Sequence, residues 1–449
     1  MASQKARKPA EFALYQYLHN PKAKTVIGGS ATPYLSLDSI TKLSNDSETT
    51  RKIFSDILST PLALTAEQGS KALRESIAST YDTSSGITLD NIIAVNATTG
   101  ANHIVLRSLL SPNDHAIVQY PAYGPLIEEP IDIGCDISYL RLDPSKNWSV
   151  DLRQLETLIR PGKTKIIVLN NPVNPTGTHI DNESQREIIK IAKEHDIHIH
   201  CDEIFRPLFY TSESAKTASL VEHPDLDYDR VSVSSSLSKV YGLSGTRVGW
   251  ITTRSPELYK RFLNYRMYSV HALSMVDEII ATEALGPRCR MAILNKHIST
   301  AQVNLDIIAK FIEKYSKQCE WTRPTCGAVA FIKLKDFKTG EAIDDVDFCN
   351  RLVEKKGVLL APATLCFAFD EPVSDNGVDG KEGMKVGLKA HDFRGRVRLH
   401  FTCPTERLEA GLKGLGEFLA EEAEGAEEKT NGASKGMSIR GSGSSRMVV

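Results

Sequence analysis

Short apolar runs alternate with amphipathic segments through the middle of this chain of 449 residues. The runs are only a few residues long, which is consistent with buried strands. They lie at residues 92–95, 116–120, 165–169, 197–202 and 230–236. Residues 66–81, before the first of these runs, and residues 182–195, between two of them, place apolar side chains at helical spacing. This alternation of strands and helices predicts an α/β domain.

The two ends and the last third of the chain have other patterns. Residues 255–320 look largely helical and are expected to connect two domains, whereas residues 321–403 contain strand-like pieces such as AVAFIKL and RVRLHF. An acidic, glycine-containing insertion at about residues 370–392 is predicted to form a loop. Residues 1–24 are polar and are predicted to form an arm. The sequence from Glu421 is charged and then rich in glycine and serine, which predicts a disordered tail.

The composition narrows the class of protein. A formal net charge of −2 points to neither a nucleic-acid partner nor an anionic membrane. There is no run of 18 apolar residues, so no membrane span is expected. The eight cysteines are scattered singly, which favours reduced thiols in the cytoplasm over disulfides or a metal site.

Residues 234–250, SSSLSKVYGLSGTRVGW, combine several features of a ligand site around Lys239. The lysine follows the end of a predicted strand, where small neighbours let it approach a ligand closely. Ser236 and Ser238 precede it, and Arg247 follows among three glycines. Arginine and hydroxyl groups together suit a phosphate, because they offer a planar fork of donors and short neutral donors. Glycines allow the backbone to turn sharply against such a ligand.

Polar residues also follow three other predicted strands. Thr98 and Thr99 come after residues 92–95 and begin a helix, whose free N–H groups suit a phosphate; ordinary helix capping is the alternative. Asn174 lies in NNPVNPTG, where two Asn-Pro pairs force a rigid turn, and a simple turn is the other interpretation. Asp202 ends a strand, and ligands of open α/β sheets bind beyond such ends.

These motifs together resemble the class I/II aminotransferases, which are fold type I enzymes that use pyridoxal 5′-phosphate (PLP). Residues 234–250 match the family pattern S-x-S-K-x-(Y/F)-G-(L/M)-x-G-x-R-x-G-(W/Y) throughout, and the other motifs follow in compatible order over about residues 26–403. The resemblance implies an α/β domain with a mostly parallel seven-stranded sheet and a smaller α+β domain from both chain ends. It also implies a homodimer with active sites at the interface.

The resemblance assigns residues to the PLP cofactor. Lys239 would hold PLP as a Schiff base and act as the catalytic base, and Asp202 would keep the pyridine nitrogen protonated, so that the ring is an electron sink. Tyr123, two residues after a proline, would stack on the ring, although loop packing also explains it. Asn174 would donate to the phenolic oxygen. The phosphate would be held by Thr98, Thr99, Ser236, Ser238 and Arg247.

The same comparison assigns residues to an amino acid substrate. Arg398, in RVRLHFT, would bind the α-carboxylate, because its fork pairs bidentately with a carboxylate. A surface ion pair is the structural alternative, and Arg396 has the same chemistry two residues earlier. Gly29, in VIGGSATPYL, and Asn174 would also lie near the substrate, and an ordinary turn equally explains Gly29.

The family's domain arrangement gives boundaries for this chain. Residues 1–47 would form an N-terminal arm and part of the small domain, and residues 48–300 the large PLP-binding domain. Residues 301–420 would form the C-terminal small domain, and residues 421–449 the disordered tail.

Two positions depart from the family pattern. Leu64 stands where a tyrosine usually reaches the neighbouring subunit's phosphate, and Phe205 stands where a tyrosine usually donates to the phenolic oxygen. The default expectation is a PLP-dependent aminotransferase acting on an L-amino acid and a 2-oxoacid through Lys239. A PLP-dependent lyase, cyclase or oxidase of amino-acid-derived secondary metabolism is the alternative, because divergent relatives direct the same carbanion chemistry to other products.

Overall fold

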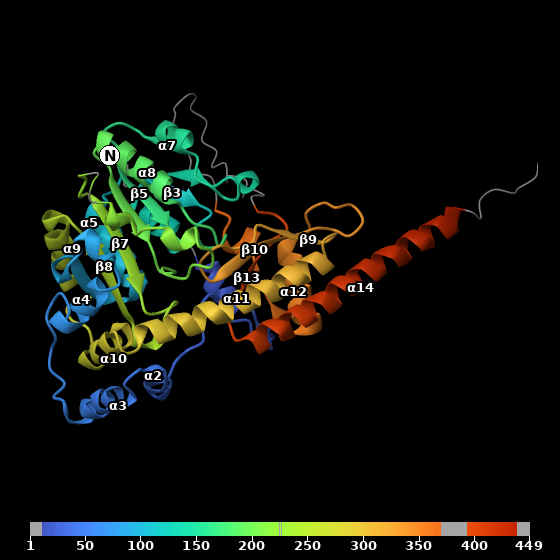
Figure 1. Cartoon of the computed structure of the whole chain (residues 1–449). Coiled ribbons are helices and arrows are strands. Elements are labelled where there is room, and N and C mark those ends of the chain that lie inside the picture. The colour runs from blue at the N-terminus through green and yellow to red at the C-terminus, as the bar shows by residue number, and fades with distance from the viewer. Residues whose placement is uncertain (1–10, 224, 226, 370–392, 438–449) are drawn as a thin grey trace, which may run out of the picture.

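The computed structural model describes residues 11–223, 225, 227–369 and 393–437, and the side chains of these residues up to Glu424 (Figure 1). The start of the predicted arm, the predicted loop at residues 370–392 and the last part of the predicted tail lie outside these ranges.

A seven-stranded sheet forms the centre of the larger part of the molecule. Its strand order is β2-β8-β7-β6-β5-β3-β4, and every neighbouring pair is parallel except the two pairs that include β8. The mostly parallel α/β fold expected from the sequence is therefore confirmed. The strands are β2 (Ile92–Asn96), β3 (His115–Tyr120), β4 (Asp136–Arg141), β5 (Thr164–Asn170), β6 (His198–Asp202), β7 (Val231–Ser236) and β8 (Val248–Thr253).

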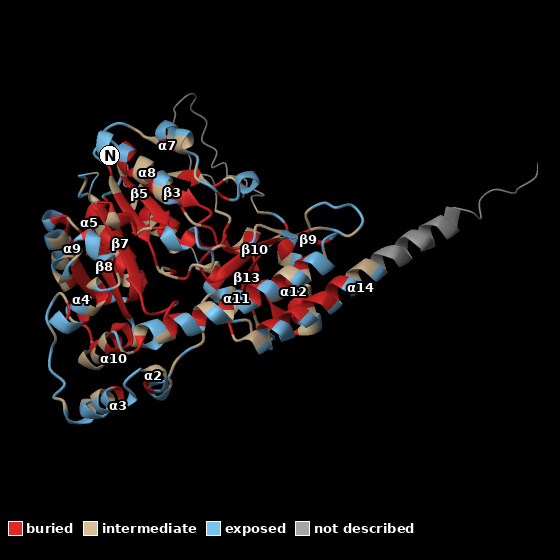
Figure 2. Ribbon diagram, in the orientation of Figure 1, coloured by how far each residue is buried: buried red, intermediate tan, exposed pale blue. Residues whose placement is uncertain are grey.

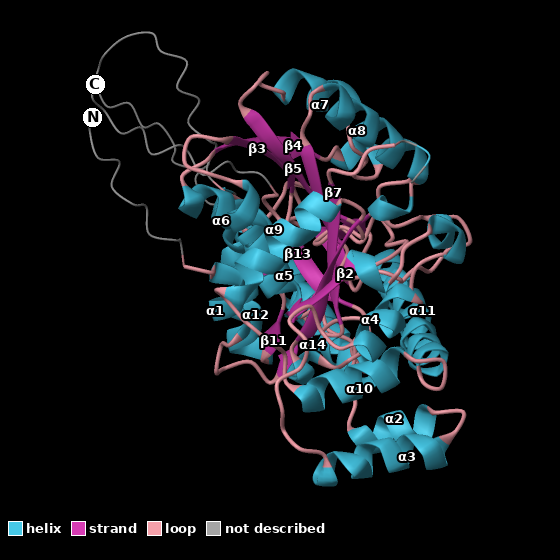
Figure 3. Ribbon diagram, turned by 90° about the vertical axis from the view of Figure 1, so that its left-hand side faces the viewer, coloured by secondary structure: helices cyan, strands magenta, loops and turns pink. Residues whose placement is uncertain are grey.

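Helices cover both faces of this sheet, as Figure 3 shows. One face packs on α5 (Ala97–Leu109), α6 (Pro125–Ile133) and α9 (Pro256–Met267). The other packs on α4 (Lys71–Ala78), α7 (Leu152–Leu158), α8 (Asn182–Glu194) and α10 (Met275–Leu285). Two outlying helices, α2 (Leu37–Leu43) and α3 (Ser47–Asp56), precede them in the chain.

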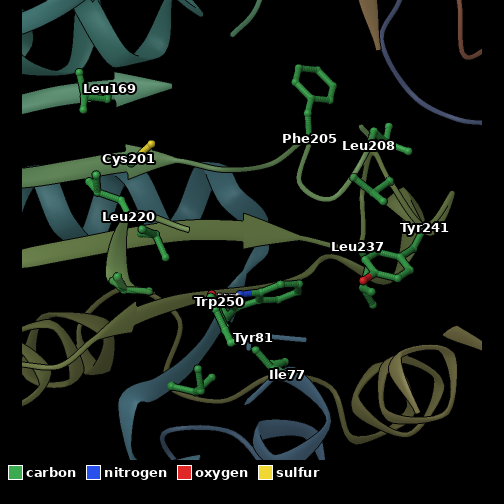
Figure 4. Close-up of a cluster of buried hydrophobic side chains, with 14 of the residues drawn as sticks. Ile77, Tyr81, Leu169, Cys201, Phe205, Leu208, Leu220, Leu237, Tyr241 and Trp250 are labelled. Carbon is green, nitrogen blue, oxygen red and sulfur yellow. Dashed lines mark hydrogen bonds between the residues drawn. The ribbon is translucent and has the colours of Figure 1, made fainter. Parts of the chain in front are cut away.

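The apolar runs of the sequence form strands because they are buried on both sides. In β2, Ile93 and Val95 face one hydrophobic cluster, and Ile92 and Ala94 face the other. This is the alternation expected of a strand between two helical layers. Figure 4 shows part of the second cluster, in which Trp250 of β8 lies beside other buried side chains, and Figure 2 shows that the central strands are buried.

The smaller part of the molecule combines both ends of the chain. Its four-stranded sheet has the order β12-β13-β10-β9, and a separate pair joins β1 to β11 in parallel, with Thr25 opposite Val358. The strands are β1 (Thr25–Val26), β9 (Cys319–Trp321), β10 (Val329–Leu334), β11 (Val358–Leu359), β12 (Ala361–Pro362) and β13 (Arg396–His400). The helices are α1 (Ala13–Leu18), α11 (Arg290–Lys314), α12 (Asp345–Lys356), α13 (Ala363–Cys366) and α14 (Thr405–Met437).

Two terminal segments differ from the pattern predicted for them. The arm contains the helix α1, whose Leu14 is buried against the small domain. At the other end, α14 continues to Met437, although disorder was predicted from residue 421. Alanine, glutamate and lysine are strong helix formers, and they dominate the sequence just after residue 420. No helix within the described ranges has the length and apolar character that a membrane span requires.

Candidate active site

A cavity of about 310 Å³ lies beyond the carboxyl ends of β5, β6 and β7 and is bordered by the small domain. Nearly all of the site residues predicted from the sequence line this one cavity, although they come from separate segments. They are Thr98, Thr99, Tyr123, Asn174, Asp202, Ser238, Lys239, Arg247 and Arg398. A doubly wound sheet brings such segments together at one edge because its parallel strands end there.

Lys239 follows β7 in a turn that is fixed from the opposite side. Its backbone carbonyl accepts hydrogen bonds from the Thr32 amide at 3.1 Å and the Thr32 hydroxyl at 2.7 Å. Burial lowers the pKa of the amine to about 8, and the positive charges of Arg398 and Arg247 act in the same direction, whereas Asp202 opposes them. The neutral, nucleophilic form of the Lys239 amine is therefore far more populated near neutral pH than that of an ordinary lysine, and it predominates above about pH 8.

Asp202 is the last residue of β6 and is buried. Its Oδ2 accepts a hydrogen bond from Asn102 Nδ2 at 2.9 Å, and its Oδ1 accepts one from the Ile204 amide at 3.0 Å. Burial raises the pKa of this carboxyl to about 6, although both hydrogen bonds and the nearby Lys239 favour the charged form. A cationic group in the cavity would stabilise the charged form of this buried carboxylate.

Asn102 is a site residue that the sequence interpretation missed. Its Oδ1 accepts a hydrogen bond from the Ser234 hydroxyl at 2.7 Å and lies 2.9 Å from His200 Nε2. Because this oxygen only accepts, His200 carries its proton on Nε2, and its Nδ1 accepts from the Ser232 hydroxyl at 3.0 Å. Burial lowers the pKa of His200 to about 3, so the ring is neutral. This network holds the Asn102 amide in the orientation that Asp202 needs.

One end of the cavity is suited to a phosphate. The hydroxyl oxygens of Thr98 and Ser238 are buried and have no hydrogen-bond partner within the described part of the chain. Thr98 and Thr99 lie in the first turn of α5, where backbone N–H groups and the helix dipole favour an anion. Arg247 forms no ion pair with any carboxylate of the described residues, and its guanidinium donates to the Ser244 carbonyl at 3.2 Å.

Close packing brings this turn to the edge of the sheet. A Cβ atom on Gly249 in β8 would lie 2.5 Å from the carbonyl carbon of Ala97, at the start of α5, and 2.8 Å from the carbonyl oxygen of Ser235. Any side chain at this position would displace the turn that carries Thr98. Glycine is required at residue 249 for steric reasons.

The other end of the cavity is suited to a carboxylate. Arg398 of β13 is buried, and it donates to Asn174 Oδ1 at 3.1 Å and to the Gly28 carbonyl at 2.6 and 3.2 Å. Within the described part of the chain, two of its five N–H groups have no hydrogen-bond partner. Burial lowers the pKa of Arg398 to about 10, so it stays charged at neutral pH. Because Asn174 Oδ1 is occupied by Arg398, its amide nitrogen is left as a donor.

Three residues with candidate chemistry lie outside the cavity lining. The Ser236 hydroxyl is buried at the end of β7 and accepts from the Ser238 amide at 3.3 Å. Gly29 lies against His400, whose Nδ1 would be 3.3 Å from a Cβ there, and its neighbour Ser30 lines the cavity instead. The guanidinium of Arg396 lies over the Trp148 ring at 4.8 Å. The predicted roles of Ser236 and Gly29 stay predictions.

The two departures from the family pattern differ in their surroundings. Phe205 is buried and lines the cavity, so an aromatic ring without a hydrogen-bond donor occupies this place; Figure 4 shows it beyond the end of β6. Leu64 lies outside the cavity and is 79% exposed.

This donor set fits PLP. At one end, hydroxyls without a partner among the described residues and an arginine without an ion pair to any of them can hold an anion. A buried carboxylate can hold a protonated ring nitrogen, and a lysine of lowered pKa can bind an aldehyde. When bound, the cofactor supplies an electron sink for bonds at the Cα atom of an amino acid.

Comparisons with known proteins agree with this geometry. The family described as aminotransferase class I and II matches residues 56–366. An aspartate aminotransferase of Thermotoga maritima is 26% identical over 334 residues, which cover 74% of this chain and 76% of that protein. A capreomycidine synthase of Streptomyces vinaceus is 24% identical over 334 residues, with the same coverage. The crystal structure of a PLP-dependent aminotransferase from Streptococcus suis superposes with a TM-score of 0.79 at 29% identity, covering 92% of this chain and 99% of that one.

Proposed function

This chain belongs to the class I and II aminotransferase family, and from that membership we propose that it transfers the amino group of an L-amino acid to a 2-oxoacid. Its cofactor is PLP, as in the related aminotransferases. The observation that carries the proposal is the convergence of Lys239, Asp202 and Arg398 on one cavity that also holds unpartnered hydroxyls for a phosphate.

The residues of the site have separate tasks in this proposal. Arg398 holds the α-carboxylate of the amino acid with its two free N–H groups. The Lys239 amine takes the proton from Cα and returns it at the next step, which requires a pKa near the working pH. Asp202 keeps a proton on the ring nitrogen, and Asn102 holds Asp202 in place. Thr98, Ser238 and Arg247 anchor the phosphate.

A second candidate is a lyase, cyclase or oxidase reaction in the same site. Phe205 supports it, because the site lacks a hydroxyl that would tune the cofactor oxygen at this place. The similarity to a capreomycidine synthase also keeps this alternative open. Both candidates use the same side chains and differ only in the fate of the carbanion.

A product analysis with and without an oxoacid separates the two candidates. The purified protein, loaded with PLP, is incubated with a panel of L-amino acids, and the products are identified by mass spectrometry. Transamination requires that the amino acid's oxoacid forms over many turnovers only when a 2-oxoacid acceptor is present and that the acceptor is aminated, because without an acceptor each cofactor can take up only one amino group. Products that form at full rate without an acceptor would favour the alternative.

We also propose that the chain forms a homodimer in the cytoplasm. Three leucines of one segment are strongly exposed, with Leu58 at 92%, Leu62 at 81% and Leu64 at 79%, and a second copy of the chain would cover them. All eight cysteines are free thiols, which is typical of proteins in a reducing compartment.

A further inference from the structure

Another cavity, of about 360 Å³, lies on the opposite face of the seven-stranded sheet from the candidate active site. At the end of β6, Asp202 lines the active-site cavity and the next residue, Glu203, lines this one. In β7, Ser234 donates to Asn102 on one face, and Ser235 lines this cavity on the other. This is the alternation of a strand, which directs successive side chains to opposite faces. The proposed reaction uses no residue of this cavity.

Two arginines bring positive charge to the lining of this cavity. Arg206 donates to the Thr217 carbonyl at 2.5 Å and to the Glu222 carboxylate at 2.9 Å. Arg290, the first residue of α11, donates to the Ser79 hydroxyl at 2.7 Å and forms no ion pair with a carboxylate of the described residues. An anionic group in the cavity would therefore meet a guanidinium whose positive charge is not balanced by a described neighbour.

A buried tyrosine hydroxyl adds a neutral donor. Tyr241 lines the cavity and is only 3% exposed, and its hydroxyl forms no hydrogen bond with any described residue. Burial raises the pKa of Tyr241 to about 12, and the charges of Arg290 and Arg206 oppose this rise, so both guanidinium groups act on the hydroxyl. Figure 4 shows Tyr241 beyond the end of β7, with its hydroxyl directed toward Trp250 in this view. An acceptor on a ligand would satisfy this donor, whose burial is otherwise unfavourable.

Flat and apolar side chains form much of the remaining lining. Trp250 and Phe209 contribute aromatic rings, and Leu294 and Ile298 contribute apolar surface from α11. The indole N–H of Trp250 donates to the Tyr81 hydroxyl at 3.2 Å, so the ring presents an apolar surface to the cavity. Aromatic rings pack well against other flat groups. The cavity has the size of a site for a small organic molecule.

Glu203 affects how much negative charge a ligand in this cavity can carry. Its Oε1 accepts from the Leu220 amide at 2.8 Å, and its Oε2 accepts from the Ser219 hydroxyl at 2.7 Å. Burial raises the pKa of this carboxyl to about 7, so part of its negative charge remains at neutral pH. Glu203 therefore repels a doubly charged phosphate more strongly than a singly charged carboxylate.

We propose that this cavity is a second ligand site, separate from the cofactor site, and that it binds an organic monocarboxylate with a flat apolar body. The carboxylate pairs with Arg290 and accepts from the Tyr241 hydroxyl, and the apolar body packs against Trp250 and Phe209. The site goes beyond the proposed function, because its lining shares no residue with the active-site cavity.

Calorimetric titration of the PLP-loaded protein with trans-cinnamate, a flat aromatic monocarboxylate, tests this site. The titration uses the Arg398→Gln variant, which removes the carboxylate ligand proposed for the active-site cavity. We expect this variant to bind cinnamate, and the further change Arg290→Gln to weaken binding at least about tenfold, because a hydrogen bond to a charged group is lost. Tyr241→Phe should weaken it several-fold. Lys296→Gln removes a charge from an exposed position of α11 outside the cavity and should change nothing.

Several results of this titration would overturn the proposal. Loss of all cinnamate binding in Arg398→Gln would place the ligand in the active-site cavity alone, and unchanged affinity after Arg290→Gln would show that this guanidinium holds no carboxylate. Phenyl phosphate or cinnamyl alcohol binding as tightly as cinnamate would show that the site does not select a monocarboxylate.

Photochemical labelling of the unaltered, PLP-loaded protein gives a second measurement, which does not depend on the folding of any Arg398 variant. The probe is 4-benzoylbenzoate, an aromatic monocarboxylate whose ketone attaches to nearby side chains on irradiation. We expect attachment to Met291 or another residue of the lining, and suppression of this label by excess cinnamate. Labels confined to the active-site cavity would overturn the proposal. Neither measurement requires turnover, so this proposal and the aminotransferase proposal can fail independently.

Discussion

The pKa of Lys239 is set by side chains from both parts of the molecule. Because burial, Arg398 and Arg247 lower it to about 8, the neutral amine predominates above that pH. We predict that covalent capture of PLP by the cofactor-free protein speeds up as the pH rises and levels off above about pH 8. Stopped-flow absorbance at a series of pH values measures this rate. A rate that still rises tenfold per pH unit at pH 9 would contradict the lowered pKa.

The contribution of Arg398 to the pKa of Lys239 can be measured by comparing variants at two arginines of the same strand, β13. Arg398→Gln removes a like charge, so the pKa of Lys239 rises and the midpoint of the capture profile moves to higher pH. Arg396→Gln is the control, because that guanidinium lies over Trp148 and not in the cavity. Equal midpoints in the two variants would show that Arg398 does not act on Lys239.

Asn102 is expected to act through Asp202. Asn102→Ala removes a hydrogen bond that lowers the pKa of Asp202, so this carboxyl stays protonated to higher pH. We predict a loss of about tenfold or more in kcat/KM, since hydrogen bonds to charged groups contribute ~1.5–3 kcal/mol. The acid limb of the pH profile should also move to higher pH. His103, the next residue on α5, is half-exposed, and His103→Ala should leave kcat/KM and the acid limb of the pH profile unchanged. An unshifted acid limb in Asn102→Ala would mean that Asn102 is merely structural.

Individual site residues could be predicted from the sequence where they belong to a short local motif. Lys239, Asp202 and Asn174 follow strands in recognisable short patterns, and the structure brings them to one cavity. Asn102 has no such pattern, because its role depends on a hydrogen bond to a residue one hundred positions away. One feature of the sequence could have indicated Asn102. It lies four residues after Thr98 in a predicted helix, and this spacing places both side chains on one side of α5.

At the scale of elements, the contact between β8 and α5 positions the end of the cavity at which we propose that the phosphate binds. We predict that Gly249→Ala weakens PLP binding and lowers the melting temperature, because the added Cβ would lie 2.5 Å from backbone atoms of Ala97. Overpacking of this kind typically costs about 1–3 kcal/mol. Gly245→Ala is the control in the same motif, since no atom of the residues that the structure describes lies within 4 Å of its Cβ position. Calorimetry and PLP titration of both variants measure the difference, and equal affinities would refute the packing argument.

The central elements could be predicted because the apolar pattern of each segment by itself indicates which of its faces are buried. Strands β2 and β5 carry apolar residues on both faces, and α8 has one apolar face, so each of these patterns predicts its element without information from the rest of the chain. The short helix α1 could not be predicted in this way. It is held by Leu14 against residues of the distant small domain, and such tertiary packing leaves little local signal.

At the scale of the whole molecule, the exposed leucine segment gives a test of assembly. We predict a dimer by light scattering and sedimentation, and a dissociated or weakened dimer for the double variant Leu58→Glu and Leu62→Glu. Burying two unpaired carboxylates in an apolar interface is unfavourable. Val303→Glu, at an exposed position on α11, is the matched control. An unaltered dimer in the double variant would place the interface elsewhere.

The central claim is that Lys239 binds PLP in the cavity between the two parts of the molecule. Sodium borohydride reduces the bond between a lysine and PLP to a stable secondary amine, so the PLP-loaded protein is reduced, digested and analysed by tandem mass spectrometry. We predict one phosphopyridoxyl group per chain, attached to Lys239. The Lys239→Arg variant, which keeps the charge, should carry none. Modification of a different lysine, or unchanged labelling of Lys239→Arg, would contradict the account.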